Sequence, residues 1–306
     1  MTFPTHIITV ILPRKGLSHF SRVNHQITAN SAKVLDVREA PITLGKAHRW
    51  HVFFMTVKVN EVDALKAKLC LLRNTLEIDL VCQTVAERQR PYRLAVFDMD
   101  STLIQCEVID ELAKAAGVGS KVATITQRSM MGELNFDESF RLRLAMLKGL
   151  DVGVVEQICD HLPRREGLRD MTKTLKARGL TLAICSGGFL PFARRLQRDY
   201  GFDYVFANSL ESVGGRLTGN VCPPIVNSDF KARALRELAA RLNLSLSSCI
   251  AVGDGANDLA MIKLAGLGIA FHAKPLVNSE APHRILHAGL DSLCYLMDTR
   301  DDAAVD

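Results

Sequence analysis

The sequence lacks three features that would restrict what this chain of 306 residues can be. No apolar run reaches the length of about 20 residues that a membrane-spanning helix needs. The start, MTFPTHIITVILPRKG, has no basic stretch before its short apolar run and no small-residue cleavage site after it, so no signal peptide is expected. The eight cysteines form no C-x-x-C pair, and several, such as Cys185 and Cys249, lie within apolar segments. We therefore expect reduced thiols in a cytoplasmic protein, without a zinc or disulfide framework.

A strong excess of charge of one sign, an internal repeat and a low-complexity segment are also missing. The formal net charge is +5, and the basic residues are spread along predicted helices such as 192–199 and 230–242. This spacing is typical of a solvated helix face and argues against a nucleic-acid-binding stripe. Hydrophobic residues make up 48% of the chain, which indicates a globular protein long enough for two domains.

Residues 1–88 form the first predicted domain. Strand composition is found at 6–13, 51–59 and 78–85, and helical composition or spacing at 16–30 and 61–77. The predicted order is strand, helix, two strands, helix, strand, which is the ferredoxin-like α+β pattern. The polar stretch 86–93 contains a proline and is expected to be the linker to the next domain.

Residues 93–306 form the second predicted domain. Helices alternate with short apolar strands at 94–98, 181–186, 204–208, 249–254 and 268–271. This alternation predicts an α/β fold with a Rossmann-like parallel sheet covered by helices on both faces. The segment from about 107 to 165 is helical throughout and too long for one crossover helix, so we expect a helical cap inserted after the first strand. Ligands bind at the carboxyl ends of such strands, where strand-ending polar residues converge.

Two acids follow the first strand of this domain, in the stretch LAVFDMDST. Asp98 ends the strand and Asp100 comes two positions later, so both can face the same crevice. Two carboxylates so close repel each other, and one stays protonated unless a cation is present. Such a pair suits Mg²⁺, an aspartyl nucleophile toward phosphorus, or a proton donor beside it. The alternative is an Asx turn with helix-capping acids.

A second cluster, AVGDGANDLAM, repeats the pattern of an apolar strand that ends in an acid. Asp254 ends the strand between two glycines, which let the backbone turn tightly and a ligand approach. Asn257 and Asp258 follow at a helix start. Asp254 can complete a metal site with the first pair, and Asp258 can hold a water or orient a neighbour. A glycine turn with capping acids is the alternative.

Two further segments offer groups that bind phosphate. Ser186, Gly187 and Gly188 lie between a strand and a helix, where free amides and a hydroxyl can cradle a phosphate. Lys231 lies near the start of the helix that precedes the Asp254 strand, and it can neutralise a phosphate and the attacking acid. A common Ser-Gly-Gly turn and a solvated lysine are the alternatives.

In order and context, these four clusters resemble the haloacid dehalogenase superfamily, and within it the phosphoserine phosphatases. The similarity covers about residues 93–297 and includes FDMDSTL, ITQRSMMGELNFDESFRLRLAMLKGL, SGGF, GRLTG and VGDGANDLAMIKLAGLGIAFHAKP. The resemblance implies Mg²⁺-dependent hydrolysis of O-phospho-L-serine to L-serine and phosphate through an aspartyl-phosphate, the last step of serine biosynthesis. It also implies that residues 93–306 are a haloacid dehalogenase-like phosphatase domain.

The resemblance also implies roles for single residues. Asp98 would be the nucleophile, and Asp100 the acid for the serine oxygen and then the base for water. Asp98, the main-chain oxygen of Asp100 and Asp254 would hold Mg²⁺, with Asp258 supporting the metal shell. Substrate phosphate would be bound by Ser186, Gly187, Lys231 and Asn257.

In the cap, the resemblance assigns Glu107 to the substrate ammonium and Arg143 to its carboxylate. The charges are complementary, and an arginine fork suits a carboxylate better than a lysine does. Arg141, the rival for the second role, would point elsewhere on a helix. Met130 and Phe136 are either lid residues that exclude water or ordinary packing residues.

The region 6–85 resembles an ACT domain, a type that often pairs through its sheets and binds amino acids. An amino-acid effector and a homodimer are therefore expected here, with plain dimerisation or packing as the alternative. For the whole chain, the enzymatic alternative is a phosphotransferase or phosphatase acting on another small phosphorylated amino acid or alcohol. A regulatory amino-acid-binding protein on an inactive phosphatase fold is the alternative from another class, but the intact acids and Lys231 argue against it. No nucleic-acid or membrane partner is expected.

Overall fold

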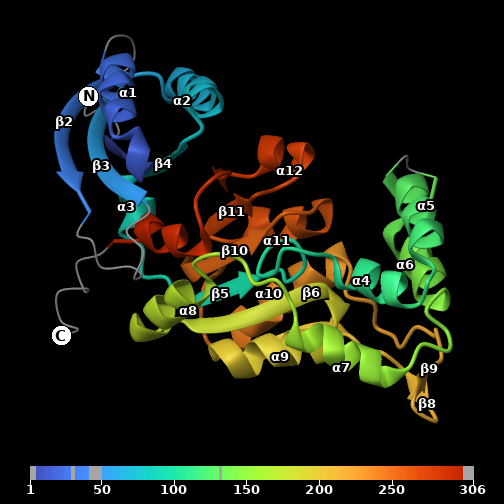
Figure 1. The fold of residues 1–306 in the computed structure, drawn as a ribbon. Helices are drawn as coiled ribbons and strands as arrows, with labels where there is room; N and C mark the ends of the chain where they lie inside the picture. Colours follow the sequence, from blue (N-terminus) through green and yellow to red (C-terminus); the bar gives the residue numbers. More distant parts are fainter. Residues whose placement is uncertain (1–4, 29–31, 41–49, 131–132, 299–306) are drawn as a thin grey trace.

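The computed structural model describes residues 5–28, 32–40, 50–130 and 133–298. It contains a small N-terminal α+β unit, a larger unit built on a parallel sheet, and a group of helices that stands beside the carboxyl ends of that sheet (Figure 1). The two units and the inserted helices match the architecture predicted from the sequence.

The N-terminal unit is a four-stranded antiparallel sheet with two helices. Its sheet order is β2-β3-β1-β4, and the β1 register pairs Val10 with Phe53 on one side and Leu80 on the other. The order of elements confirms the predicted ferredoxin-like pattern. In chain order the elements are β1 (Thr5–Pro13), η1 (Arg14–Gly16), α1 (Ser18–Thr28), β2 (Ala32–Glu39), β3 (Trp50–Val59), α2 (Val62–Leu76) and β4 (Asp79–Thr84).

The two faces of this small sheet have different partners. Ile8 and Val10 of β1 pack with Val23 and Ile27 of α1 and with the leucines of α2 in one core. Ile11, on the opposite face of β1, belongs to the core of the larger unit instead. Because strand side chains alternate between faces, β1 contributes to both cores.

The larger unit has a six-stranded parallel sheet in the order β12-β11-β10-β5-β6-β7. The short β12 is absent from the sequence prediction, and β6 continues three residues past the predicted end, with a break in register between Cys185 and Phe189. The strands are β5 (Leu94–Phe97), β6 (Thr181–Phe189), β7 (Tyr204–Asn208), β10 (Cys249–Gly253), β11 (Leu267–Phe271) and β12 (His283–Ile285).

Helices cover both faces of this sheet, as predicted. Leu94 and Val96 of β5 face a core that includes α10 and α11, while Ala95 and Phe97 face the core that includes α8 and α9. The covering elements are α8 (Leu168–Ala177), α9 (Leu190–Tyr200), α10 (Ser228–Arg241), η2 (Leu246–Ser248), η3 (Ala256–Asp258), α11 (Leu259–Leu264), α12 (Pro275–Glu280) and η4 (Leu290–Leu296).

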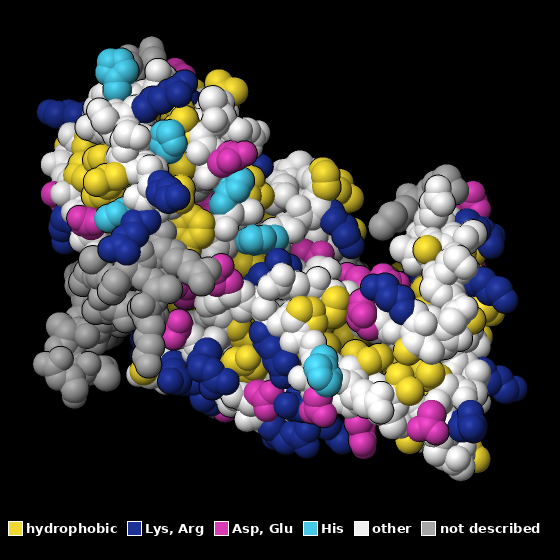
Figure 2. Space-filling model, in the orientation of Figure 1, with side chains coloured by type: hydrophobic (Ala, Val, Ile, Leu, Met, Phe, Trp, Pro, Cys, Tyr) yellow, Lys and Arg dark blue, Asp and Glu magenta, His cyan; other side chains and the backbone are white. Residues whose placement is uncertain are grey.

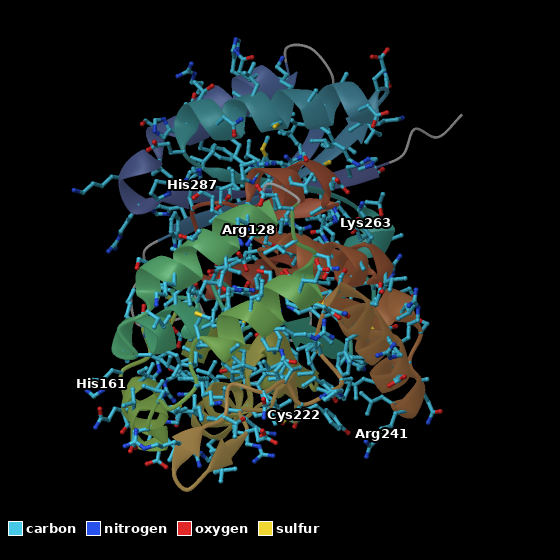
Figure 3. The ribbon with its side chains drawn as sticks, turned by 90° about the vertical axis from the view of Figure 1, so that its right-hand side faces the viewer. Arg128, His161, Cys222, Arg241, Lys263 and His287 are labelled. Carbon is cyan, nitrogen blue, oxygen red and sulfur yellow. The ribbon has the colours of Figure 1, made fainter. Side chains whose placement is uncertain are left out.

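The insertion after β5 is helical and forms the predicted cap. Its elements are α4 (Val108–Ala115), α5 (Gly119–Met130), α6 (Phe136–Ala145) and α7 (Val152–Asp160). A hairpin of β8 (Ser212–Val213) and β9 (Arg216–Leu217), which the sequence analysis did not predict, adds to the cap because the amide of Leu217 donates to the carbonyl of Leu150 at 2.8 Å. Figure 3 views the molecule from the cap side, with Arg128 of α5 near the centre and His161, at the end of α7, at the lower left.

The two units are joined by buried polar contacts. The carboxylate of Asp79 accepts hydrogen bonds from the amides of Leu286, His287 and Ala288 at 2.7–3.0 Å. The expected linker begins differently from the prediction, because residues 85–88 form helix α3 (Val85–Arg88) and Arg88 is buried. The Arg88 guanidinium donates to the Tyr295 carbonyl at 2.6 Å, so this stretch fixes the two units together.

Among the helices of the described ranges, none has both the length and the apolar content of a membrane span. Each of the eight cysteines is a free thiol.

Candidate active site

The predicted convergence of strand-ending acids is present at the carboxyl edge of the parallel sheet. Strands β5 and β10 are neighbours, and the amide of Asp98 extends their ladder by donating to the Val252 carbonyl at 2.9 Å. Asp98 and Asp254 therefore leave adjacent strands side by side. On the visible face, Figure 2 shows a notch between the cap helices and the rest of the molecule, with acidic side chains at its base.

Three carboxylates form what we call the acid cluster: Asp98, Asp254 and Asp258. One oxygen from each lies within 4.8 Å of the others, and all three residues are buried. Burial, followed by the charges of Asp98 and Asp258, raises the pKa of Asp254 to about 8. Burial and the charge of Asp98 raise the pKa of Asp258 to about 6. Because a divalent cation would remove this repulsion, the donor set fits a hard metal ion.

Lys231 contacts two members of this cluster and is fully buried, unlike the solvated lysine considered as an alternative. Its Nζ is 2.8 Å from Oδ1 of Asp98 and 2.6 Å from Oδ1 of Asp258. Burial alone would lower the pKa of Lys231, but the charges of Asp258 and Asp98 raise it above the ordinary value. Asn227 caps the N-terminus of α10 through the amide of Phe230, which fixes the helix that carries Lys231.

Asp258 supports its neighbours with both carboxylate oxygens. Oδ1 accepts from Lys231, and Oδ2 accepts from the amide of Gly255 at 2.9 Å. These contacts fix the turn that follows β10.

Asp100 has a different environment from Asp98 although only one residue separates them. Its Oδ2 accepts a long hydrogen bond of 3.4 Å from the amide of Val108, while its buried Oδ1 has no hydrogen-bond partner among the described residues. Burial, then the charges of Glu107 and Asp98, raises the pKa of Asp100 well above its ordinary value. Burial therefore favours the protonated form of Asp100.

The segment 98–106, which we call the catalytic loop, turns sharply after β5. Ser101 has a positive φ of 57°, which is uncommon for a residue with a side chain. Its hydroxyl donates to Oε1 of Glu107 at 2.8 Å, and the hydroxyl of Thr102 donates to Oδ1 of Asp254 at 3.3 Å. The loop is therefore connected both to the cap and to the acid cluster.

The predicted phosphate cradle lies at the irregular end of β6. Ser186 is buried, and its Oγ accepts a hydrogen bond from the amide of Gly188 at 3.0 Å. Helix α9 begins only at Leu190, after β6 has ended at Phe189. The cradle residues therefore lie in the last part of the strand and not directly at the helix N-terminus. A Cβ at Gly188 would lie 2.9 Å from Oδ2 of Asp100, which shows how closely the cradle approaches this acid.

The surroundings of Gly187 include two more of the predicted residues. A Cβ built there would lie 3.2 Å from the Phe136 ring and 3.9 Å from Nδ2 of Asn257. Phe136 of the cap therefore contacts the cradle, and it also lies near Phe140, with ring centroids 6.2 Å apart. The side chain of Met130 lies outside the described part of the chain.

Asn208 also belongs to this site, although no role was predicted for it from the sequence. Its Nδ2 donates to the Gly187 carbonyl at 2.8 Å, and its Oδ1 accepts from the amide of Val226 at 2.9 Å. It is buried and positions the cradle. A polar residue at the end of the apolar strand YVFAN was the available signal, the same one that identified Asp98 and Asp254.

The two cap charges differ from their neighbours in burial and surroundings. Glu107 precedes α4 and receives the Ser101 hydroxyl. Arg143 is partly buried, whereas Arg141 is exposed. Burial lowers the pKa of Arg143, while the charges of Glu107, Asp110 and Asp100 oppose this effect. Arg143 therefore lies in the field of the site's carboxylates, and Arg141 does not share its burial.

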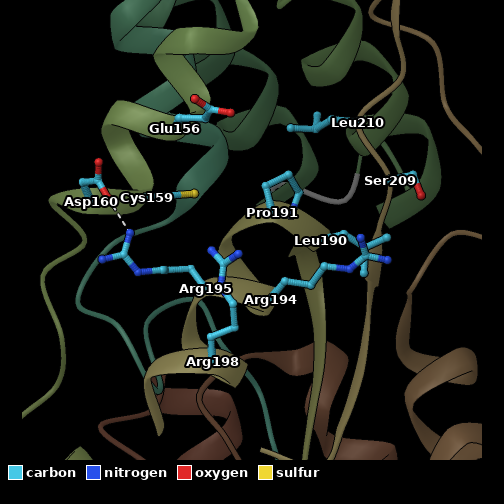
Figure 4. Close-up of a pocket in the computed structure, with 10 residues that line it drawn as sticks. All are labelled: Glu156, Cys159, Asp160, Leu190, Pro191, Arg194, Arg195, Arg198, Ser209 and Leu210. Atoms are coloured by element: carbon cyan, nitrogen blue, oxygen red, sulfur yellow. Dashed lines mark hydrogen bonds and ion pairs between the residues drawn. The ribbon is translucent and has the colours of Figure 1, made fainter. Parts of the chain in front are cut away.

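A separate groove of about 570 Å³ lies between α7 and α9 (Figure 4). Arg195 on α9 pairs with Asp160 across it and with Asp199 on its own helix. Arg194 and Arg198 are exposed, as expected for the solvated face of α9. The lining residues include none from the acid cluster or the cradle, so this groove is not part of the candidate active site.

Comparisons with known proteins agree with this geometry. The haloacid dehalogenase-like hydrolase family matches residues 92–266. The chain is 42% identical over 243 residues to the phosphoserine phosphatase of Archaeoglobus fulgidus, covering 79% of this chain and 71% of that protein. A haloacid dehalogenase family hydrolase of Salmonella enterica serovar Typhi has a similar structure, with a TM-score of 0.86, 33% identity and coverage of 97% and 99%. A phospho-aspartyl intermediate analogue of a phosphoserine phosphatase matches with a TM-score of 0.64 and 39% identity over 68% of this chain and all of that one.

Proposed function

Since this chain belongs to the phosphoserine phosphatases of the haloacid dehalogenase-like hydrolase family, we propose that it hydrolyses O-phospho-L-serine to L-serine and phosphate through a phospho-aspartyl intermediate. This is a reaction of serine biosynthesis. The substrate follows from the relatives, and the intermediate is consistent with the solved analogue.

The observation that carries the mechanism is the contrast between the two acids of the motif. Asp98 forms a buried ion pair with the Lys231 ammonium, with Nζ 2.8 Å from Oδ1. Asp100 is buried, its Oδ1 has no hydrogen-bond partner among the described residues, and its pKa is raised. One carboxylate ready to attack and one acid ready to donate a proton are what the first half-reaction needs.

In the first half-reaction, a carboxylate oxygen of Asp98 attacks the phosphorus of phosphoserine. The bond between phosphorus and the serine oxygen breaks, and the proton of Asp100 passes to that oxygen. Lys231, the hydroxyl of Ser186 and the amide of Gly187 offset the charge of the phosphoryl oxygens, with Asn257 beside them. Serine leaves, and the phosphoryl group remains on Asp98.

In the second half-reaction, Asp100 is now a carboxylate and takes a proton from a water molecule. The water oxygen attacks phosphorus, the bond to the Asp98 oxygen breaks, and phosphate is released. Both half-reactions need Asp100 at nearly the same place. The close approach of Gly188 to its Oδ2 supports this double use.

The acid cluster supports a divalent metal, and we propose Mg²⁺ because the donors are hard oxygens. Asp98, Asp254 and the main-chain oxygen of Asp100 would hold it, with Asp258 fixing the turn around them. The ion would neutralise charge on the transferring phosphoryl group and on Asp98.

Selectivity would come from the cap. Phosphoserine carries an ammonium group and a carboxylate besides its phosphate, and Glu107 and Arg143 offer the complementary charges. Phe136, in contact with the cradle, would exclude water when substrate is bound.

Two variants test this proposal. Asp98→Asn removes the attacking charge and should reduce turnover by several orders of magnitude, while Asp100→Asn should slow both half-reactions by about 10²–10⁴-fold. Phosphate release from O-phospho-L-serine at saturating Mg²⁺, and rapid-quench measurement of acid-stable phosphoprotein, are the readouts. Asp98→Asn with a tenth of wild-type turnover, or Asp100→Asn forming phosphoprotein at the normal rate, would refute the assigned roles.

For the N-terminal unit, we propose an ACT-like domain over residues 1–88, with the phosphatase domain at 93–306 and its cap at about 107–165. The ferredoxin-like strand order supports this. Dimerisation and amino-acid binding are the roles proposed for this domain. Sedimentation and calorimetric titration with serine would test them. The expected cytoplasmic location accords with the eight free cysteines.

A further inference from the structure

Arg165 lies in the segment that leads from the cap back to the sheet. This segment runs directly beside the catalytic loop, which leads from β5 into the cap. Ile104 and Arg164 pair in an antiparallel bridge, and the amide of Arg165 donates to the Leu103 carbonyl at 2.9 Å. The outgoing and returning connections of the cap are therefore held together by backbone hydrogen bonds.

The side chain of Arg165 reaches from this return segment toward the acids. Its Nη2 donates to the Ser101 carbonyl at 2.5 Å, and its Cζ lies 5.9 Å from the centre of the Phe271 ring. Burial lowers the pKa of Arg165, and the charge of Asp254 opposes that effect. The guanidinium thus lies between the catalytic loop and the strand ends that carry the acid cluster.

The residue that Arg165 holds has an unfavourable backbone conformation. Ser101 has φ 57°, and such conformations persist in residues with a Cβ where the surroundings fix them. Two fixing contacts come from the loop and the start of α4, because the Ser101 amide donates to the Cys106 carbonyl at 3.2 Å and its hydroxyl donates to Glu107. Arg165 adds a third contact, to the Ser101 carbonyl, from a segment outside the loop and α4.

We propose that Arg165 is a positioning residue for the phosphatase reaction, because it fixes the Ser101 carbonyl and with it the loop that presents Asp100. This inference rests on the proposed function. Asp100 immediately precedes Ser101 and must meet the leaving serine oxygen and then the attacking water. A displacement of about 1 Å in such an arrangement is enough to slow a reaction strongly.

The neighbouring residue provides a matched control. Arg164 is also a partly buried arginine of the return segment, but its Nη2 donates to Asp199 of α9 at 3.2 Å, away from the loop. Arg165→Met should reduce kcat by about 10–100-fold through loss of a charge-assisted hydrogen bond, while Arg164→Met should change it by less than about threefold. Arg165→Lys keeps a charge and a donor, and it should regain part of the loss.

The pattern of kinetic effects separates this role from substrate binding. The loss in Arg165→Met should be equal for phosphoserine and p-nitrophenyl phosphate and should fall on kcat, with KM little changed. A loss confined to phosphoserine, or one that appears in KM alone, would overturn the proposal.

A measurement without metal or substrate completes the test. The amides of Thr102, Leu103 and Ile104 all donate to the Met99 carbonyl, at 3.3, 2.8 and 3.1 Å. Hydrogen exchange followed by mass spectrometry should show faster exchange of these amides in Arg165→Met than in Arg164→Met. Unchanged exchange would overturn the proposal, and so would faster exchange spread equally over the central strands in both Arg165 variants. If the wild type released no phosphate from phosphoserine, the proposed function would fall, while exchange would still report on the loop.

Discussion

Replacing Lys231 with methionine removes the ammonium group that lies between Asp98 and Asp258, while keeping a side chain of similar length. Both ion pairs are buried, with Nζ–Oδ1 distances of 2.8 and 2.6 Å. Removing one partner of a buried pair typically costs about 3–5 kcal/mol, because the remaining charge is uncompensated. We expect a loss of this size in the free energy of unfolding at pH 8 without divalent cations.

The loss should depend on pH with a definite sign. Burial and neighbouring charges raise the pKa of Asp254 to about 8 and that of Asp258 to about 6 in the folded protein. A raised folded-state value means that the folded state binds more protons than the unfolded one, so stability falls as pH rises from about 4 toward these values. Lys231→Met removes a charge that lowers the pKa of Asp258, so the pKa of Asp258 should rise further. The destabilisation by this substitution should therefore be largest at pH 8 and smaller at pH 6, where protonation removes part of the uncompensated charge.

Urea unfolding followed by far-UV circular dichroism in EDTA, at both pH values, would measure these differences. Lys263→Met is the matched control, because Lys263 is half exposed and pairs with Glu280 at the surface. Its loss should be about 1 kcal/mol or less at either pH. Mg²⁺ should restore part of the stability of Lys231→Met at pH 8 by supplying positive charge to the same carboxylates. Equal losses in the two lysine variants at pH 8 would refute the reasoning.

Three further predictions concern catalysis and metal binding. Arg143→Ala should reduce kcat/KM for phosphoserine by about 30-fold or more, as expected for a buried charge pair, with little change for p-nitrophenyl phosphate. Arg141→Ala should leave kcat/KM unchanged for both substrates. An equal loss on both substrates in Arg143→Ala would show that Arg143 does not recognise the amino-acid part of the substrate. Gly188→Ala should lower kcat, because its Cβ would displace Asp100, and a variant with wild-type kcat would contradict the close approach. Mg²⁺ affinity in calorimetric titrations should fall as pH decreases below about 8, since Asp254 must lose its proton to bind the ion, and a constant affinity from pH 8.5 to 6.5 would disprove this coupling.

The fold and the acids were predictable because they depend on local patterns. Apolar strands that end in Asp98 and Asp254 are visible in the sequence, and parallel pairing of β5 with β10 then brings the two acids together. The helical cap was predictable from its length and spacing. In each case the period of the pattern and the direction of the strands determine where the side chain lies.

Other parts of the site depend on contacts that no local pattern records. Arg165 looks like any basic residue in PRREG, and its contact with the Ser101 carbonyl exists only after the cap has returned to the sheet. Strand β12 has three residues, too few for a periodic signal, and it is defined by its pairing with β11. The burial of Lys231 likewise follows from the packing of α10, and from the sequence alone a solvated lysine was the alternative.

The hydrogen bonds between Asp79 and residues 286–288 constrain how the two units of this protein can evolve. One carboxylate receives three successive amide protons from residues 286–288, and Ile11 and Val81 extend the core of the larger unit into the small sheet. Deleting the N-terminal unit would leave three donors and an apolar surface without partners. A replacement domain of unrelated sequence would need a carboxylate at the position of Asp79. The outer surfaces of the two units can therefore change independently during evolution, whereas the residues at the contact between the units are constrained to change together.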